Sequence, residues 1–179
     1  RRKESLLLES RRFTSSLKRQ MDDMEMLMRL GRQITSSLTP DSVLTAIVDA
    51  AVELTGAEEG SLLLIDPDTG ELYMRAARNF QDEFVRTFRL AITDSLAGAV
   101  IRSGEPVLVD GSTPQKIKTS YLVQSLLYVP LQMNGRVFGV LGVDNRHSRL
   151  PLTQKHVKLL SMLASYAVIA LENARLYEE

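Results

Sequence analysis

Two histidines and their neighbours are the residues whose types could support acid–base or metal chemistry. His147 stands beside Ser148 and three residues after Asp144, so a Ser-His-Asp set exists on paper. Neighbours in sequence rarely adopt the geometry in which one side chain activates the next. His147 and His156 lie among charged residues, near a strand end and a helix start, so we interpret them as solvated surface histidines. The sequence therefore predicts no catalytic residue, no metal site and no cofactor.

The chain of 179 residues contains no cysteine. Disulfides, thiolate metal ligands, cysteine nucleophiles and thioether-linked chromophores are excluded by this absence. With no other nucleophile or metal cluster evident, we predict that the chain is not an enzyme in its own right.

The balance of charge gives no electrostatic case for a nucleic-acid partner. Lys and Arg number 22, as do Asp and Glu. The basic residues of the first 38 positions are dispersed among Ser, Glu and Leu, which is typical of a solvated helix. No run approaches the roughly 20 apolar residues that a bilayer span needs. We expect no nucleic-acid partner, no membrane insertion and a cytoplasmic location.

Residues 1–38 carry a continuous helical pattern, with no Pro and a single Gly, Gly31. Apolar residues recur at helical intervals, and one heptad register collects them at two core positions. Ser10, Gln20 and Gly31 interrupt this register, which therefore predicts a marginal coiled coil. One core position holds Leu6, Phe13, Leu27 and Ile34, and the other holds Leu17, Met24 and Leu38.

Residues 39–179 form the second predicted unit. Thr39 can cap a helix that begins at Pro40, and Asn134-Gly135 predicts a type I′ hairpin turn because both residues accept positive φ angles. Stretches that are apolar on both faces indicate a sheet covered by helices on both sides. The fold class predicted is α+β, an antiparallel sheet between helices, with long N- and C-terminal helices. We expect helices from 40 to 55, 81 to 88, 95 to 102 and from 153 onward, strands over 61–65, 71–77, 107–109, 125–133 and 136–144, and a polar loop over 110–120.

This order of elements, together with particular residues, resembles a GAF domain over roughly residues 24–179. Each motif is weak alone, but six in the right order are specific. They are the entry helix into 39–41, GSLLLID at 60–66, LAG at 96–98 with SGEPV at 103–107, VPL at 129–131, GRVFGVL at 135–141 and ALENARLY at 170–177.

The resemblance implies a small-molecule pocket on one face of the sheet. Amide groups at the start of the helix over 95–102 could hold an anionic group, although a plain helix cap is the simpler interpretation. Arg78 beside Asn79 could clamp a carboxylate or phosphate, and a solvated Arg is equally compatible with the sequence. The residues that the resemblance places around the pocket are Ser61, Arg78, Asn79, Ser95, Leu96, Ala97, Asp110, Tyr121 and Ser125.

The resemblance also limits the chemistry. Members that reduce free methionine sulfoxide or attach a bilin need cysteines, which are absent here. Cyclic-nucleotide-binding members carry an Asn-Lys pair, a downstream Phe and an Asp-Glu pair, and only the Asn and a basic neighbour are matched. A cyclic-nucleotide site is therefore a secondary alternative. The corresponding residues are Asn145-Arg146, Leu152 and His156-Val157, with Gly142 and Ala77 where an acid and a base-stacking aromatic would lie.

We predict a non-catalytic input or relay domain that binds a small molecule and passes a conformational change through its terminal helices to an effector domain in the same polypeptide. The alternative is a dimerisation spacer whose pocket is filled by its own side chains. Both alternatives assume a homodimer, because both long helices carry apolar stripes. The expected interface residues are Leu27, Ile34, Leu160, Leu163, Ala167 and Leu171.

Overall fold

The structure is a computed structural model that describes residues 1–36, 39–111, 115–118 and 121–178. It divides the chain into two compact units, Arg1–Ser36 and Ser37–Glu179. The first unit is the long helix α1, Arg2–Ser36, as the helical pattern predicts. Exposed apolar side chains recur along α1, at Leu6, Phe13, Leu17, Met21, Met24 and Met28.

The second unit is built on an antiparallel five-stranded sheet, which the sequence predicts as an antiparallel sheet. Its strand order is β2-β1-β7-β6-β3, so the first and last hairpins meet along β1 and β7. The turn between β6 and β7 is the expected one, with positive φ at Asn134 and Gly135. The strands are β1 (Glu59–Ile65), β2 (Leu72–Arg78), β3 (Val107–Val109), β6 (Ser125–Met133) and β7 (Arg136–Asn145).

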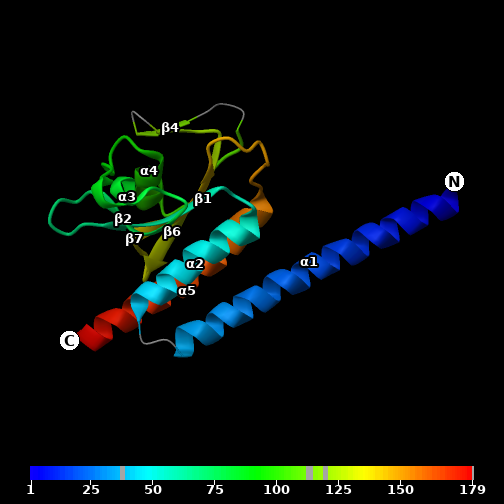
Figure 1. Ribbon diagram of the computed structural model, residues 1–179, viewed down its shortest axis with the longest axis horizontal. Helices are drawn as coiled ribbons and strands as arrows, with labels where there is room; N and C mark the ends of the chain where they lie inside the picture. The colour runs from blue at the N-terminus through cyan, green and yellow to red at the C-terminus, as the bar shows by residue number, and fades with distance from the viewer. Residues whose placement is uncertain (37–38, 112–114, 119–120, 179) are drawn as a thin grey trace. The chain divides into compact units, whose positions relative to one another are not determined.

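Helices cover both faces of this sheet, which confirms the predicted layers (Figure 1). Helices α2 (Pro40–Thr55) and α5 (Gln154–Glu178) pack together on one face. Helices α3 (Asp82–Thr87) and α4 (Leu96–Ser103) lie on the other. A Cβ atom at Gly60 would lie 2.8 Å from the Val52 side chain, so the missing side chain lets α2 approach β1 closely. We refer to the two sides as the helix-pair face and the roof face.

Two local expectations differ from the structure. The region expected as a polar loop contains a small hairpin of β4 (Gln115–Lys118) and β5 (Tyr121–Val123). Thr39 precedes α2 with extended backbone but makes no side-chain cap. Its hydroxyl lies 2.6 Å from that of Ser42, which donates to the Thr39 carbonyl oxygen. Pro40 begins the helix as predicted.

Candidate functional site

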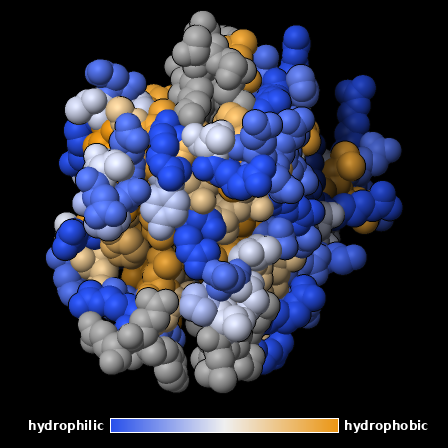
Figure 2. All heavy atoms as spheres, turned by 60° about the vertical axis from the view of Figure 1, so that its left-hand side comes forward, coloured by the Kyte–Doolittle hydropathy of each residue, from blue (hydrophilic) through white to orange (hydrophobic). Residues whose placement is uncertain are grey.

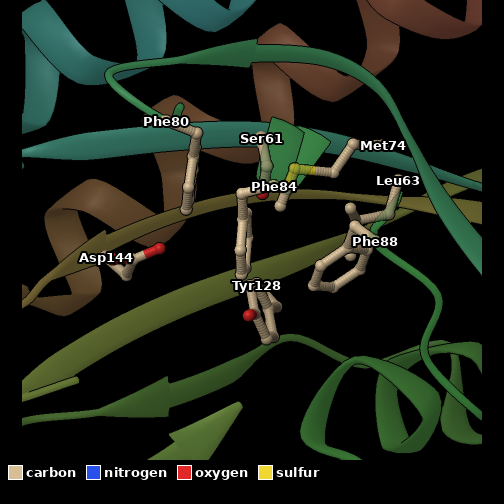
Figure 3. Close-up of a pocket in the computed structure, with 8 residues that line it drawn as sticks. All are labelled: Ser61, Leu63, Met74, Phe80, Phe84, Phe88, Tyr128 and Asp144. Carbon is tan, nitrogen blue, oxygen red and sulfur yellow. The ribbon is translucent and has the colours of Figure 1, made fainter. Parts of the chain in front are cut away.

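A pocket lies between the roof face of the sheet and helix α3 (Figure 3). Strands β1, β2, β6 and β7 form its floor, and α3 with its flanking residues covers it. Only about 10 Å³ is open to the centre of a water-sized molecule, so the pocket in this state has room for about one water. The lining residues are Ser61, Leu63, Met74, Phe80, Phe84, Phe88, Tyr128 and Asp144.

The alternation of side chains along the strands brings the floor residues to one face. Ser61 pairs with Gly142 on β7, and Gly142 in turn pairs with Tyr128 on β6. A Cβ atom at Gly142 would lie 2.4 Å from the Tyr128 ring, so this glycine provides the space in which the ring lies. The Tyr128 ring therefore lies over Gly142 on the neighbouring strand.

Three phenylalanines form the cover, which we name the aromatic roof: Phe80, Phe84 and Phe88. Phe84 lies within α3, and Phe80 and Phe88 lie just outside its two ends. The Phe84 ring stacks on Phe80 with centroids 5.5 Å apart and meets Phe88 at 5.6 Å with a tilt of 54°. Phe84 therefore lies in the middle of the pocket, between the other two rings (Figure 3).

Helix α3 is held by two partly buried side chains, Phe84 and Val85, which pack against the roof-face core. None of its residues, Asp82–Thr87, is buried. Phe88, just beyond its end, is only 1% exposed and anchors the roof to the sheet. On this side of the domain, hydrophobic side chains reach the surface among hydrophilic ones (Figure 2). A six-residue helix with no buried residue has little packing energy to keep it in place.

Two carboxyl groups, which we name the acidic pair, lie side by side at one end of the pocket floor. Glu59 on β1 is paired in register with Asp144 on β7, and the two are 7% and 2% exposed. Glu59 Oε1 lies 3.4 Å from Arg146 Nε. Glu59 Oε2 is buried and has no hydrogen-bond partner within the part of the chain that the structure describes.

Burial raises the pKa of Asp144 to about 9, with a side-chain hydrogen bond to Glu59 and the charge of Glu59 acting in the same direction. Arg146 opposes this rise in pKa, and Glu58 adds to it. The pKa of the Tyr128 hydroxyl is also raised, first by burial and then by Asp144 and Glu59. Asp144 is therefore a neutral acid at pH 7 in this closed state.

Of the residues that the resemblance places around the pocket, the structure brings Ser61 there. Arg78 instead lies 3.5 Å from Asp49 and 3.4 Å from Glu53 on α2, on the helix-pair face. Asn79 has a positive φ of 67° and donates to the Glu58 carbonyl oxygen at 2.7 Å, as a turn residue does. The expectation that Arg78 and Asn79 line the pocket is therefore corrected.

The start of α4 is a plain cap. The Ser95 hydroxyl accepts the Gly98 N–H at 3.0 Å and donates to the Ala91 carbonyl oxygen. Leu96 is partly buried and Ala97 is fully buried in the roof-face core, and neither lines the pocket. These contacts replace the anion-binding interpretation of this helix start.

The remaining expected pocket residues lie elsewhere. Asp110 is exposed beyond the end of β3. The buried Ser125 hydroxyl accepts from Asn145 Nδ2 at 3.1 Å, and Asn145 Oδ1 accepts the Glu58 N–H at 2.9 Å. Asn145 on β7 thus bonds to β6 and to the residue before β1 instead of facing a ligand. The Tyr121 side chain lies outside the described residues.

Both histidines have structural contacts. The backbone N–H groups of His147 and Ser148 donate to the Glu58 carboxylate. His156 Nδ1 accepts the Thr153 N–H at 3.0 Å, which caps the start of α5. Among the residues that the structure describes, no group of three or more His, Cys, Asp or Glu side chains could hold a metal ion.

The expected dimer residues on α5 are buried within their own protomer. Leu160, Leu163 and Ala167 have no exposed surface, because α5 packs them against α2 and β6. They cannot form an interface with another chain without leaving this core, so that assignment is corrected. Leu171 is half-buried. Leu27 and Ile34 lie on α1, and the Ile34 side chain is outside the described residues.

Sequence reasoning missed most of the true lining. In the sequence, Tyr128 has the surroundings of an ordinary core aromatic. Asp144 is a candidate there only as part of a set with His147 and Ser148. Two signals were available: the spacing by four of Phe80, Phe84 and Phe88, and acids at Glu59 and Asp144 next to apolar strand residues. Glu59 and Asp144 become neighbours through the register of β1 with β7. Neither segment alone determines that register.

The fold is that of a known class of domain. The family model described as "GAF domain" matches residues 37–172, and the chain belongs to this family.

Curated relatives are longer signalling proteins. The chain is 25% identical over 155 residues to a probable 3′,5′-cyclic phosphodiesterase from Caenorhabditis elegans, covering 78% of the chain and 21% of that protein. It is 25% identical over 160 residues to an uncharacterized sensor-like histidine kinase from Chloroflexus aurantiacus, covering 87% of the chain and 26% of that protein. The chain thus spans about a quarter or less of these relatives.

Solved structures show the same fold. The GAF domain of a phosphoenolpyruvate-protein phosphotransferase from Acinetobacter superposes with a TM-score of 0.75 at 20% identity, covering 87% of this chain and 96% of that one. Free methionine-R-sulfoxide reductase from Neisseria meningitidis gives a TM-score of 0.72 at 23% identity, covering 87% and 91%. These likenesses establish the fold alone.

One described segment, Gln154–Arg175 of α5, is long and apolar enough by composition to cross a membrane. Its fully buried residues Leu160, Leu163 and Ala167 belong to the core of the domain. A core helix of a globular domain meets the same criterion, and α5 packs as one. Membrane insertion is therefore not indicated by this helix.

Proposed function

We propose that this domain is a regulatory module in which a small molecule enters beneath the aromatic roof and the resulting change is passed to helix α5. The observation that supports this most directly is that the pocket and α5 share strands. Tyr128 on β6 and Asp144 on β7 line the pocket. The same two strands pack against α5.

Only the sheet itself separates the pocket from helix α5. Leu127 and Val129 flank Tyr128 on β6, are fully buried and, by alternation, face the helix pair. A displacement of the Tyr128 ring therefore moves backbone on which α5 rests. Packed interiors transmit such shifts instead of absorbing them.

The proposal includes a homodimer joined through exposed apolar positions. On α5, Met162 and Ile169 are each 48% exposed and lie seven residues apart. The exposed pairs Leu6 and Phe13, Leu17 and Met24, and Met21 and Met28 on α1 have the same spacing. A repeat of seven is the requirement of a coiled coil, so helices of two copies can pair along these positions. An effector domain such as a kinase, cyclase or phosphatase would follow in the same polypeptide.

A ligand-free spacer is the second candidate, because Phe84 already fills the middle of the pocket. The relation to cyclic phosphodiesterases suggests a cyclic nucleotide as a third. Two features oppose a cyclic nucleotide here. The negative charge of Glu59 would repel a phosphate, and Asn145 is already bonded to Ser125 and Glu58.

The absence of cysteine allows a direct test with a single label. A spin label on Met162→Cys would report the distance between α5 helices in the dimer, with and without Phe84→Ala to open the roof. We expect the distance distribution to shift when the roof is opened. Tyr73→Ala is the matched control, because it truncates an aromatic on β2 that does not line the pocket.

An unchanged distribution in the Phe84→Ala variant would favour the spacer. A monomer at high micromolar concentration, detected by analytical ultracentrifugation, would remove the homodimer from the proposal.

A further inference from the structure

The aromatic roof contains a slot the size of one planar ring, currently filled by Phe84. The rings of Phe80 and Phe88 flank it, with centroids 5.5 and 5.6 Å from that of Phe84. These separations lie in the range of packed aromatic pairs, so another aromatic ring would make the same contacts. Because α3 has no buried residue, Phe84 can withdraw without breaking the core of the domain.

The polar groups on the floor next to this slot are the carboxyl group of Asp144 and the hydroxyl groups of Ser61 and Tyr128. Asp144 lines the pocket itself, and Glu59, its cross-strand neighbour, lies on the same face as Ser61. The buried Oε2 atom of Glu59 has no hydrogen-bond partner among the described residues. The protonated Asp144 shares a side-chain hydrogen bond with Glu59, but a carboxylate can accept several, and a ligand N–H group would supply a further donor.

The charges near the acidic pair favour a cation. The negative charges of Glu59 and Glu58 both act on Asp144, and Arg146, already 3.4 Å from Glu59, is the basic group that acts on it. Aromatic faces also attract cations. An anion at this end would face like charges without bulk water to screen them.

We propose that the pocket takes a planar aromatic ligand bearing a cationic N–H group, such as an aryl amidinium or aryl ammonium. The ligand ring replaces that of Phe84, and its N–H groups donate to Asp144 and Glu59. This inference rests on the proposed function, since it assigns a ligand class to the same pocket.

Binding of such a cation should release a proton from Asp144. Asp144 holds a proton in the closed state because burial and Glu59 raise its pKa. A neighbouring cation lowers that pKa, so the carboxyl O–H bond breaks, its electron pair stays on the carboxylate and the proton passes to solvent. At pH 7 we expect release of about one proton per ligand bound.

Three compounds with the same ring and different charge test the inference: benzamidine, benzamide and benzoate. Calorimetry would measure their dissociation constants for the wild-type chain and for Phe84→Ala, in which the slot is vacated. We expect benzamidine to bind Phe84→Ala about tenfold or more tightly than benzamide, as a charge-assisted hydrogen bond implies, and benzoate to bind most weakly. Repeating the titration in buffers of different ionisation enthalpy gives the number of protons released.

Variants of the acidic pair test whether these two residues cause the preference for benzamidine over benzamide. In the Phe84→Ala background, Asp144→Asn and, separately, Glu59→Gln should each reduce the preference for benzamidine over benzamide. Asp68→Asn removes a carboxylate from the exposed β1–β2 turn and should leave the preference unchanged.

Equal or tighter binding of benzamide or benzoate, persistence of the preference in both acidic-pair variants, or no binding of benzamidine to Phe84→Ala would overturn the inference. None of these results would overturn the proposed function, because the label on α5 tests the coupling between roof and helix without any ligand. A neutral or anionic compound that binds the vacated slot would leave that function intact and reassign the ligand class.

Discussion

The two faces of the central sheet are built for different tasks. The helix-pair face is closed by aliphatic side chains such as Ile47, Leu160 and Leu163, which have no exposed surface. The roof face carries stacked phenylalanines, a buried tyrosine and two buried carboxyl groups beneath a six-residue helix. Both faces use the same strands, and alternate residues of β6 and β7 belong to one or the other.

This difference distinguishes the face whose packing can rearrange from the face whose packing cannot. Aliphatic packing at interior density resists rearrangement, whereas a short helix with partly exposed side chains opens at small cost. Opening of the roof would therefore leave the packing of the helix-pair face in place.

The largest effect is expected from Leu163→Ala on the helix-pair face. Leu163 is fully buried, so its truncation removes apolar contacts and leaves a cavity. We expect the free energy of unfolding to fall by about 3 kcal/mol. Urea unfolding followed by circular dichroism measures it. A loss below about 1 kcal/mol would mean that this face can collapse around a cavity, against the contrast drawn here.

The acidic pair should make stability depend on pH. The folded state raises the pKa of Asp144 from 3.8 to about 9, so between these values it holds a proton that the unfolded chain has released. Stability from this group is therefore greatest below pH 3.8 and is lost as pH rises toward 9.

Asp144→Asn should remove that slope, so the variant gains stability relative to the wild type as pH rises from 6 to 8. Urea unfolding at both pH values gives the slopes, and Asp68→Asn should retain the wild-type slope. Parallel slopes for the wild type and Asp144→Asn would show that Asp144 is ionised in the folded state.

The smallest effect is expected from Phe84→Ala in the roof. Phe84 is only partly buried, so we expect a loss of about 1 kcal/mol, well below the value for Leu163→Ala. The same urea measurement gives both values. A loss equal to that of Leu163→Ala would place Phe84 in the rigid core and argue against an opening roof.

Much of the fold could be predicted because its signals are local. The Asn134-Gly135 turn fixes one hairpin, and apolar runs on both faces indicate helices on two sides. The β4–β5 hairpin was missed because Gln115–Lys118 is polar and shows no buried face in the sequence. Where polar residues form strands, periodicity carries no signal.

The site was harder to predict because it depends on which face each strand residue takes. Arg78 ends β2 in either case, but the proximity of α2 decides that its guanidinium meets Asp49 and Glu53. Likewise, Glu59 and Asp144 become neighbours only through the pairing of β1 with β7. Such contacts between distant segments are not contained in any window of sequence.

Native-state hydrogen exchange of the wild-type chain tests the contrast between the faces most directly. Amides of α3 should exchange through an opening of low free energy, independent of denaturant, while those of α5 around Leu163 should exchange only with global unfolding. Protection of α3 equal to that of α5 would contradict the account, because a roof that opens only when the whole domain unfolds cannot admit a ligand.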